Sequence, residues 1–125
     1  MTDPTPVDLS LGQTKRLRRR SEFEQLREHG RRVTKGCLIV NWTVLPPGTP
    51  SRVGVITSRK LGKAHVRSRA RRLLRESFRL HQHDLREPVA VALVARASIL
   101  GRKLADVERD YLAAMRQADL LRTPS

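Results

Sequence analysis

The feature that most constrains the fold is a continuous apolar run, Val-Ala-Val-Ala-Leu-Val-Ala, at residues 89–95. The run is too short for an ordinary helix, and valine is common in strands. An uninterrupted apolar run of this length is typical of a strand that is buried on both faces. The run therefore predicts a sheet whose central strand is covered by other elements, as in a layered arrangement of helices and strands.

The first half of the chain predicts one helix and two strands. Ser21 is followed three residues later by Glu24, as in a capping box, so a short helix is expected to begin at Ser21 and to stop at Gly30. Residues 37–45 and 51–57 are β-rich and flank a loop that contains proline and glycine. We expect these two strands to be antiparallel to each other across that loop.

Two further helices complete the predicted order of helix, two strands, helix, strand, helix. Residues 64–81 and 105–120 carry apolar side chains at helical spacing, and the second of these helices is expected to pack on the sheet. The order predicts an α+β fold, a two-layer α/β sandwich. We expect one domain over residues 14–120, a disordered tail over 1–13 and a short C-terminal tail over 121–125.

Positive charge is concentrated in two segments of this chain, whose formal net charge is +14. Residues 14–36 hold nine basic and three acidic residues, and residues 58–79 hold nine basic residues and one acidic residue. The net charges of these segments, +6 and +8, account for the whole excess, and the other residues are balanced. Such concentration favours a polyphosphate partner, because each neutralised phosphate releases counterions. Simple solubility and an anionic membrane surface are the alternatives.

The composition excludes several other classes of protein. A single cysteine, Cys37, excludes an internal disulfide framework and a zinc site made of several cysteines. No apolar run approaches the roughly 18 residues that a membrane span requires, and the N-terminus lacks the apolar core of a signal peptide. We therefore expect a cytoplasmic protein that does not associate with a membrane.

The predicted helix at 64–81 separates apolar and arginine side chains onto different sides. At about 100° per residue, one side carries Val66, Ala70, Leu73, Leu74, Ser77 and Leu80, and the other carries Arg67, Ser68, Arg71, Arg72, Arg75 and Arg79, with Arg69 near the boundary. Like charges one turn apart repel by about 0.2–0.5 kcal/mol per pair. Glu76 is the one acid in the segment, so the arrangement favours an anionic partner. Arginine suits phosphate because its planar fork binds two oxygens.

These residues resemble the protein subunit of bacterial ribonuclease P. The similarity is most specific in two blocks, Ser58-Arg59-Lys60-Leu61-Gly62-Lys63-Ala64 and Arg67-Ser68-Arg69-Ala70-Arg71-Arg72-Leu73-Leu74-Arg75-Glu76. The segment Arg16-Leu17-Arg18-Arg19-Arg20-Ser21-Glu22-Phe23 is similar to the family's basic lead into a helix that carries a phenylalanine. Three positions depart from the family pattern: Ser68 replaces the usual asparagine, and Arg27 and Asn41 stand where relatives often carry aromatic residues.

The resemblance implies a fold, a function and a set of partners. It implies a left-handed βαβ crossover, as in the second domain of ribosomal protein S5. It also implies that the chain binds ribonuclease P RNA and precursor tRNA, that the RNA catalyses removal of the 5′ leader with Mg²⁺, and that the protein has no cofactor, metal or catalytic residue of its own. No obligate protein partner is implied.

The resemblance also implies the site residues. Those implied to face RNA are Arg59, Lys60, Lys63, His65, Arg67, Ser68, Arg69, Arg71, Arg72 and Arg75. Those implied to line a cleft for the single-stranded leader are Phe23, Arg27 and Asn41.

Independent reasoning from the residues gives no catalytic site and leaves two alternatives open. His81 and His83 are two residues apart, so on a helix they face away from each other and make a poor catalytic or metal pair. The alternatives are a non-catalytic RNA-binding protein, such as a ribosomal component, and a DNA-binding regulator. The latter is disfavoured because readers of the DNA groove mix amide side chains among their basic ones.

Overall fold

The protein is an α+β domain built on a four-stranded mixed sheet, seen in a computed structural model that describes residues 16–17 and 20–122. The strands are β1 (Arg31–Lys35), β2 (Leu38–Val44), β3 (Arg52–Ile56) and β4 (Val89–Ala95). Their order in the sheet is β1-β2-β4-β3, with β4 antiparallel to β2 and parallel to β3. The tail predicted over 1–13 lies outside the described residues.

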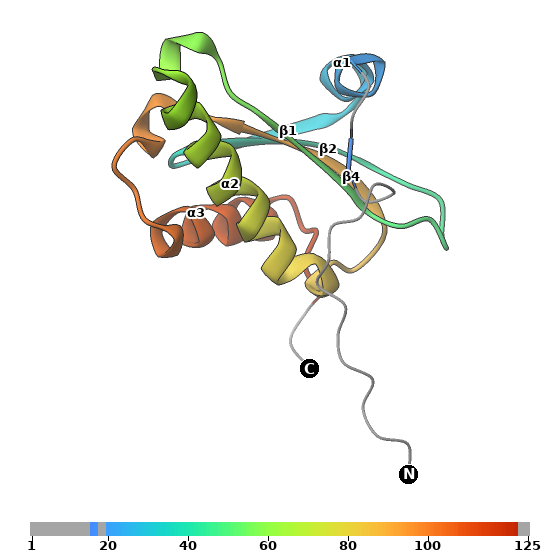
Figure 1. Cartoon of the computed structure of the whole chain (residues 1–125). Helices are drawn as coiled ribbons and strands as arrows, with labels where there is room; N and C mark the ends of the chain where they lie inside the picture. Colours follow the sequence, from blue (N-terminus) through green and yellow to red (C-terminus); the bar gives the residue numbers. More distant parts are fainter. Residues whose placement is uncertain (1–15, 18–19, 123–125) are drawn as a thin grey trace.

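Helices cover both faces of this sheet. The helices are α1 (Arg20–His29), α2 (Ala64–His81) and α3 (Leu104–Gln117), and three single 3₁₀ turns are η2 (Arg59–Leu61), η3 (Gln82–Asp84) and η4 (Ala97–Ile99). Helices α2 and α3 pack on one face and on each other, whereas α1 lies alone on the other face (Figure 1). The predicted α+β sandwich is confirmed, and the bounds predicted for α2 and β4 agree with the structure. No helix in the described part of the chain combines the length and apolarity needed to cross a bilayer.

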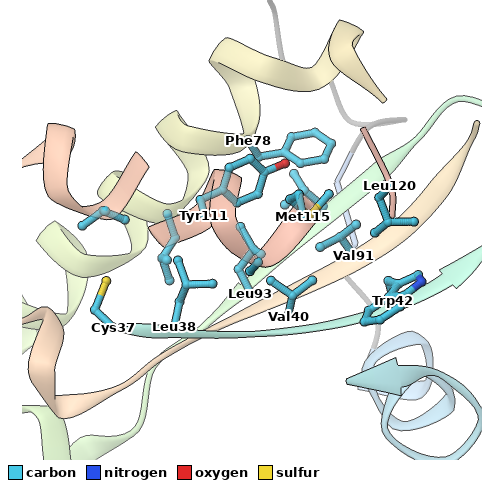
Figure 2. Packing of buried hydrophobic residues seen from close by; sticks show 14 of the residues in the cluster. Cys37, Leu38, Val40, Trp42, Phe78, Val91, Leu93, Tyr111, Met115 and Leu120 are labelled. Carbon is cyan, nitrogen blue, oxygen red and sulfur yellow. The ribbon is translucent and has the colours of Figure 1, made fainter. Parts of the chain in front are cut away.

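Strand β4 is buried on both faces, as its apolar run predicts. Val89, Val91 and Leu93 point into the main core beneath α2 and α3, where each is fully buried. Figure 2 shows this core, in which side chains from β2 and β4 meet Phe78, Tyr111 and Met115 of the two helices. Ala90 and Ala92, which alternate with them along β4, belong to a smaller cluster beneath α1. The sheet therefore packs against α1 on one face and against α2 on the other.

The sequence-based predictions were wrong at several points of topology. Strand β3 does run antiparallel to β2, but the two are not neighbours, because β4 is inserted between them. Strand β1 was not predicted, since a short edge strand with one half-buried apolar residue, Val33, carries little alternation. Helix α1 begins at Arg20, so Ser21 lies inside its first turn and Glu24 pairs with Arg20 instead of completing a capping box. Helix α3 is shorter than predicted at its C-terminal end.

The βαβ unit formed by β3, α2 and β4 is the part of the fold that positions the basic helix. The two strands are parallel neighbours, and α2 connects them across one face of the sheet. This connection agrees with the crossover that the family resemblance implies, and its left-handedness stays a prediction. The unit places one flank of α2 beside β3 and the other flank beside α3.

Candidate nucleic-acid interface

Three half-buried arginines, Arg67, Arg71 and Arg75, follow the flank of α2 that lies beside β3, and we call them the cleft-side arginines. Arg71 is held from two directions. Its Nη1 donates to the hydroxyl of Thr57 at 2.9 Å, and its Nη2 donates to the hydroxyl of Ser68 at 3.1 Å. Ser68 therefore orients an arginine. Its side chain is exposed, so it is also accessible to a ligand.

The N-terminal segment adds a fourth arginine to this flank. Leu17 donates its backbone N–H to the carbonyl of Val53 at 2.8 Å, so the segment extends the sheet beside β3. Arg52 anchors this segment to β3 and α1. Its guanidinium donates to the carbonyl of Arg16 at 3.0 Å and forms an ion pair with Glu22 at 2.8 Å. Arg16 is thereby placed beside the cleft-side arginines.

A hollow of about 210 Å³ separates this segment from α2. Its lining consists of Arg16, Leu17, Phe23, Val53, Gly54, Val55 and Arg75. It therefore has cationic groups on two sides and an aromatic ring on a third. This combination suits a phosphate group and an adjoining base.

The electrostatics of the hollow favour an anion. Burial, followed by the charges of Arg16 and Arg71, lowers the pKa of Arg75 from its ordinary value. The Nε atoms of Arg16 and Arg67 are shielded from solvent and have no hydrogen-bond acceptor among the described residues. Buried donors without acceptors destabilise a folded protein, and an anion with several acceptor oxygens would satisfy them. Within the described residues, no carboxylate forms an ion pair with a cleft-side arginine.

The three residues implied to bind the leader lie on the α1 side of the sheet. Phe23 packs directly on Gly54 of β3, so closely that a Cβ atom on Gly54 would overlap its ring. Asn41 of β2 and Gly54 flank the same residue of β4, Ala92, in the hydrogen-bonded register. Directly paired residues share a face of a sheet, so Asn41 and Phe23 lie on the same face. Arg27 is exposed on α1, one turn after Phe23.

The other residues implied to face RNA are divided between two regions. Arg59 and Lys60 on η2, Lys63, and His65 in the first turn of α2 are all exposed and continue the basic surface beyond the helix. Arg72 is exposed on α2 and lines a hollow together with Arg69 and with Leu104 of α3. Arg69 is separated from the cleft-side arginines, because it lies on the α3 flank and donates from Nη2 to the carbonyl of Arg102 at 2.8 Å.

Sequence reasoning did not identify Gly54 and Thr57 as parts of the site, and it named Arg16 only as a member of the basic lead into α1. An isolated glycine inside a strand often marks a close approach by another group, so Gly54 carried a usable signal. Thr57 carried none, and the basic lead did not show where Arg16 lies, because both positions depend on packing between distant segments. Phe78 was also missed as a core residue, although it is fully buried where α2 packs on the sheet.

His81 contacts residues of α3 and of the turn after α2, and these contacts give it a structural role. Its Nδ1 lies 3.0 Å from the carboxylate of Asp84, its Nε2 lies 3.6 Å from that of Glu108, and its ring stacks on Tyr111. These contacts join the end of α2 to α3. Within the residues that the structure describes, no group of three or more His, Cys, Asp and Glu side chains is arranged to hold a metal ion.

The fold and this surface define a small basic α+β protein with an arginine-lined hollow beside a sheet. The family model "Ribonuclease P" matches residues 11–119. The ribonuclease P protein component of Symbiobacterium thermophilum is 35% identical over 106 residues, which cover 85% of this chain and 92% of that protein. That of Desulfatibacillum aliphaticivorans is 40% identical over 89 residues, which cover 70% and 73% of the two chains. The chain belongs to the ribonuclease P protein family.

Solved structures agree with the fold. The RNase P protein of Staphylococcus aureus has a TM-score of 0.76 at 19% identity, with 86% of this chain and 98% of that chain covered. The RNase P protein of Thermotoga maritima has a TM-score of 0.72 at 23% identity, with 82% and 96% covered.

Proposed function

We propose that this chain is the protein subunit of ribonuclease P, in which it promotes removal of the 5′ leader from precursor tRNA. Family membership supports a part in tRNA processing. In this proposal the chain acts in the cytoplasm, binds ribonuclease P RNA through α2, and holds the single-stranded leader beside Phe23. Catalysis resides in the RNA, with Mg²⁺ as its metal ion.

The observation that carries the proposal is the hollow between the N-terminal segment and α2. Its lining combines two arginines, Arg16 and Arg75, with the ring of Phe23, and it adjoins the sheet face that carries Asn41. Arg67 and Arg71 lie on the same flank of α2, and among the described residues none of these four arginines forms an ion pair with a carboxylate. A single RNA strand presents phosphates at one edge and bases at the other, which matches this division of charge and aromatic surface. Double-helical DNA would not offer an unstacked base to Phe23, so the arrangement supports RNA with a single-stranded segment.

The role assigned to Phe23 requires an exposed ring edge. Phe23 is half-buried, whereas Trp42, Phe78 and Tyr111 are buried in the main core. Of the chain's four aromatic residues, Phe23 is therefore the one available for stacking on a base. Stacking of this kind contributes about 1–3 kcal/mol per base in proteins that bind single strands.

Reconstitution tests the proposal. The protein is added to a bacterial ribonuclease P RNA and a precursor tRNA at low magnesium concentration, and release of the leader is measured. We expect the folded protein to accelerate leader removal, and the protein without the RNA to cleave nothing. A folded protein that gives no acceleration would refute the proposed function, and cleavage by the protein alone would refute the placing of catalysis in the RNA.

The double substitution Arg71→Ala with Arg75→Ala tests the interface. Each lost phosphate contact reduces the slope of log K against log salt by about 0.7–0.9. We therefore expect the variant to bind ribonuclease P RNA more weakly, with a slope of log K against log salt that is flatter by about 1.4–1.8. An unchanged slope would remove the cleft-side arginines from the interface.

A further inference from the structure

We propose that a second cationic surface, formed by Arg69, Arg96 and Arg102, binds the phosphate backbone of a helical segment of the catalytic RNA. We call these residues the loop-side arginines. They lie on the opposite flank of α2 from the cleft-side arginines, beside the segment that follows β4. The proposal rests on the proposed function, since it assigns an additional contact with the same RNA.

Hydrogen bonds to backbone carbonyls hold the three side chains together. Arg69 donates to the carbonyl of Arg102 at 2.8 Å, and Arg102 donates from Nε to the carbonyl of Ser98 at 3.3 Å. Arg96 donates from Nη1 to the carbonyl of Gly36 at 2.8 Å. The hydroxyl of Ser98 also reaches that carbonyl, at 3.4 Å, so the chain of contacts is continuous from α2 to the turn between β1 and β2. Figure 1 shows η4 (orange) beside the first turns of α2 (green).

Carbonyl partners order these arginines without neutralising them. A carbonyl carries no net charge, so each guanidinium keeps its full positive charge while it loses conformational freedom. Arg102 uses Nε for its carbonyl, which leaves both of its terminal nitrogens available for two oxygens of one phosphate. Because the entropy of ordering a long side chain is lost during folding, less is lost when the RNA binds.

Nearby carboxylates are occupied elsewhere. Asp106 accepts the backbone N–H of Lys103 at 3.1 Å and lies 3.8 Å from Arg109. Asp110 accepts the backbone N–H of Cys37 at 3.0 Å. Within the described part of the chain, the loop-side arginines form no ion pair. All three are exposed, and Lys103 adds an exposed cation next to them in the sequence.

The absence of an aromatic side chain from this surface indicates which kind of RNA it fits. Phe23 lies on the other face of the sheet, and the other three aromatic residues are buried in the core. Without an aromatic ring the surface offers mainly cationic groups, whose contacts to phosphates suit a paired helix with internally stacked bases. The leader is single-stranded and matches the Phe23 side, so we assign the loop-side arginines to the catalytic RNA.

Arg69 points away from the cleft-side arginines, so the loop-side and cleft-side arginines form two distinct surfaces. Arg69 and Arg71 are two residues apart on α2, which places their side chains about 160° apart around the helix axis. One helix therefore presents arginines in two directions. The protein can contact a helical segment on one flank of α2 while the other flank faces the hollow beside Phe23.

The test compares two double variants that remove equal charge. Arg96→Gln with Arg102→Gln removes two loop-side arginines. Arg86→Gln with Arg116→Gln removes two exposed arginines, of which Arg86 pairs with Asp119 near the start of β4. Folding is first checked for each variant by circular dichroism and thermal unfolding. Binding to a bacterial ribonuclease P RNA, and separately to a single-stranded leader oligonucleotide, is then measured between about 50 and 200 mM salt.

We expect the Arg96/Arg102 variant to bind the catalytic RNA about 10-fold more weakly, with a salt slope flatter by about 1.8. We expect it to bind the leader oligonucleotide as the Arg86/Arg116 variant does. Equal binding of the catalytic RNA by both variants, while the Arg71/Arg75 variant binds weakly, would overturn this proposal and leave the proposed function intact. A loss confined to the leader would overturn the assignment to helical RNA. Unchanged binding by all three variants would refute both proposals.

Discussion

Gly54 and Phe23 form a contact whose energy can be measured by a double-mutant cycle. Gly54 is buried on the α1 side of β3, and a Cβ atom there would overlap two atoms of the Phe23 ring and lie 3.0 Å from Cβ of Leu17. In Gly54→Ala the ring must leave its place on the strand. We expect a loss of about 1–3 kcal/mol in the free energy of unfolding, the usual effect of adding a methyl group to a packed site. For a chain of 125 residues, each kcal/mol of lost stability lowers Tm by roughly 4 °C.

Whether Gly54→Ala lowers the free energy of unfolding should depend on the presence of the Phe23 ring. Phe23→Ala removes the overlapping atoms, so in that background Gly54→Ala should no longer destabilise the protein, since alanine is favoured over glycine inside a strand by roughly 0.5–1 kcal/mol. Denaturant unfolding of the four proteins gives the coupling free energy. We expect a value of about 1–3 kcal/mol, which is normal for residues in contact. Additivity within about 0.5 kcal/mol would refute the placement of the ring on Gly54.

The Gly54→Ala variant also tests whether Phe23 contacts the leader. If the ring is displaced, stacking on a leader base is lost, which predicts about 5- to 150-fold weaker binding of a leader oligonucleotide. Mature tRNA without a leader is the control, and its affinity for the reconstituted complex should not change. Equal weakening for both RNAs would show that Gly54→Ala acts through general unfolding.

The remaining predictions concern single interactions. Asp110→Ala removes the carboxylate that accepts the backbone N–H of Cys37, so we expect a loss of about 1–3 kcal/mol in denaturant unfolding, and an unchanged midpoint would contradict this role. The hydrogen bond from Arg79 holds the pKa of Glu76 below its ordinary value, so the stabilisation is present at neutral pH and disappears as the pH falls through that lowered pKa. Thermal unfolding should therefore show Glu76→Gln less stable than the parent at neutral pH and equal to it in strong acid, and a constant difference would count against this assignment. Ser68→Ala removes the hydroxyl that orients its arginine partner and should weaken RNA binding a few-fold, whereas Ser68→Asn should retain the affinity.

Local signals in the sequence predicted the elements well where each element's own residues decide its structure. The bounds of α2 follow from its apolar side, and those of β4 follow from its uninterrupted apolar run. The neighbours of β3 could not be read in this way, because strand order depends on pairing between segments far apart in the chain. The connection across the loop at 46–50 suggested a hairpin, but the more apolar β4 takes the central position beside both β2 and β3.

In the candidate site, too, local sequence predicted some features, whereas others depend on contacts between distant segments. The arginine pattern of α2 predicted an anionic partner and set Arg69 apart from Arg71 around the helix, yet it did not indicate which elements lie beside each of them. A helical projection gives relative directions, and only the packing of α2 against both β3 and α3 decides which flank each arginine occupies. The contribution of Arg16 depends on a backbone bond to Val53, and the contribution of Arg96 depends on the carbonyl of Gly36. Neither partner could be inferred from spacing.

The central position of β4 has a consequence for the order in which the protein acquires its function. Strands β1, β2 and β3 and the whole of α2 leave the ribosome before β4 does, yet β2 and β3 are joined in the sheet only through β4. Until residues 89–95 are available, the hairpin of β1 and β2 has no connection to β3, and the arginine helix has no complete sheet beneath it. Such nonlocal closure is slow compared with helix formation. A nascent chain that ends before β4 therefore carries nearly all of the excess positive charge but not the complete sheet that positions it, so the arrangement of the arginines is established only when synthesis of the domain is nearly finished.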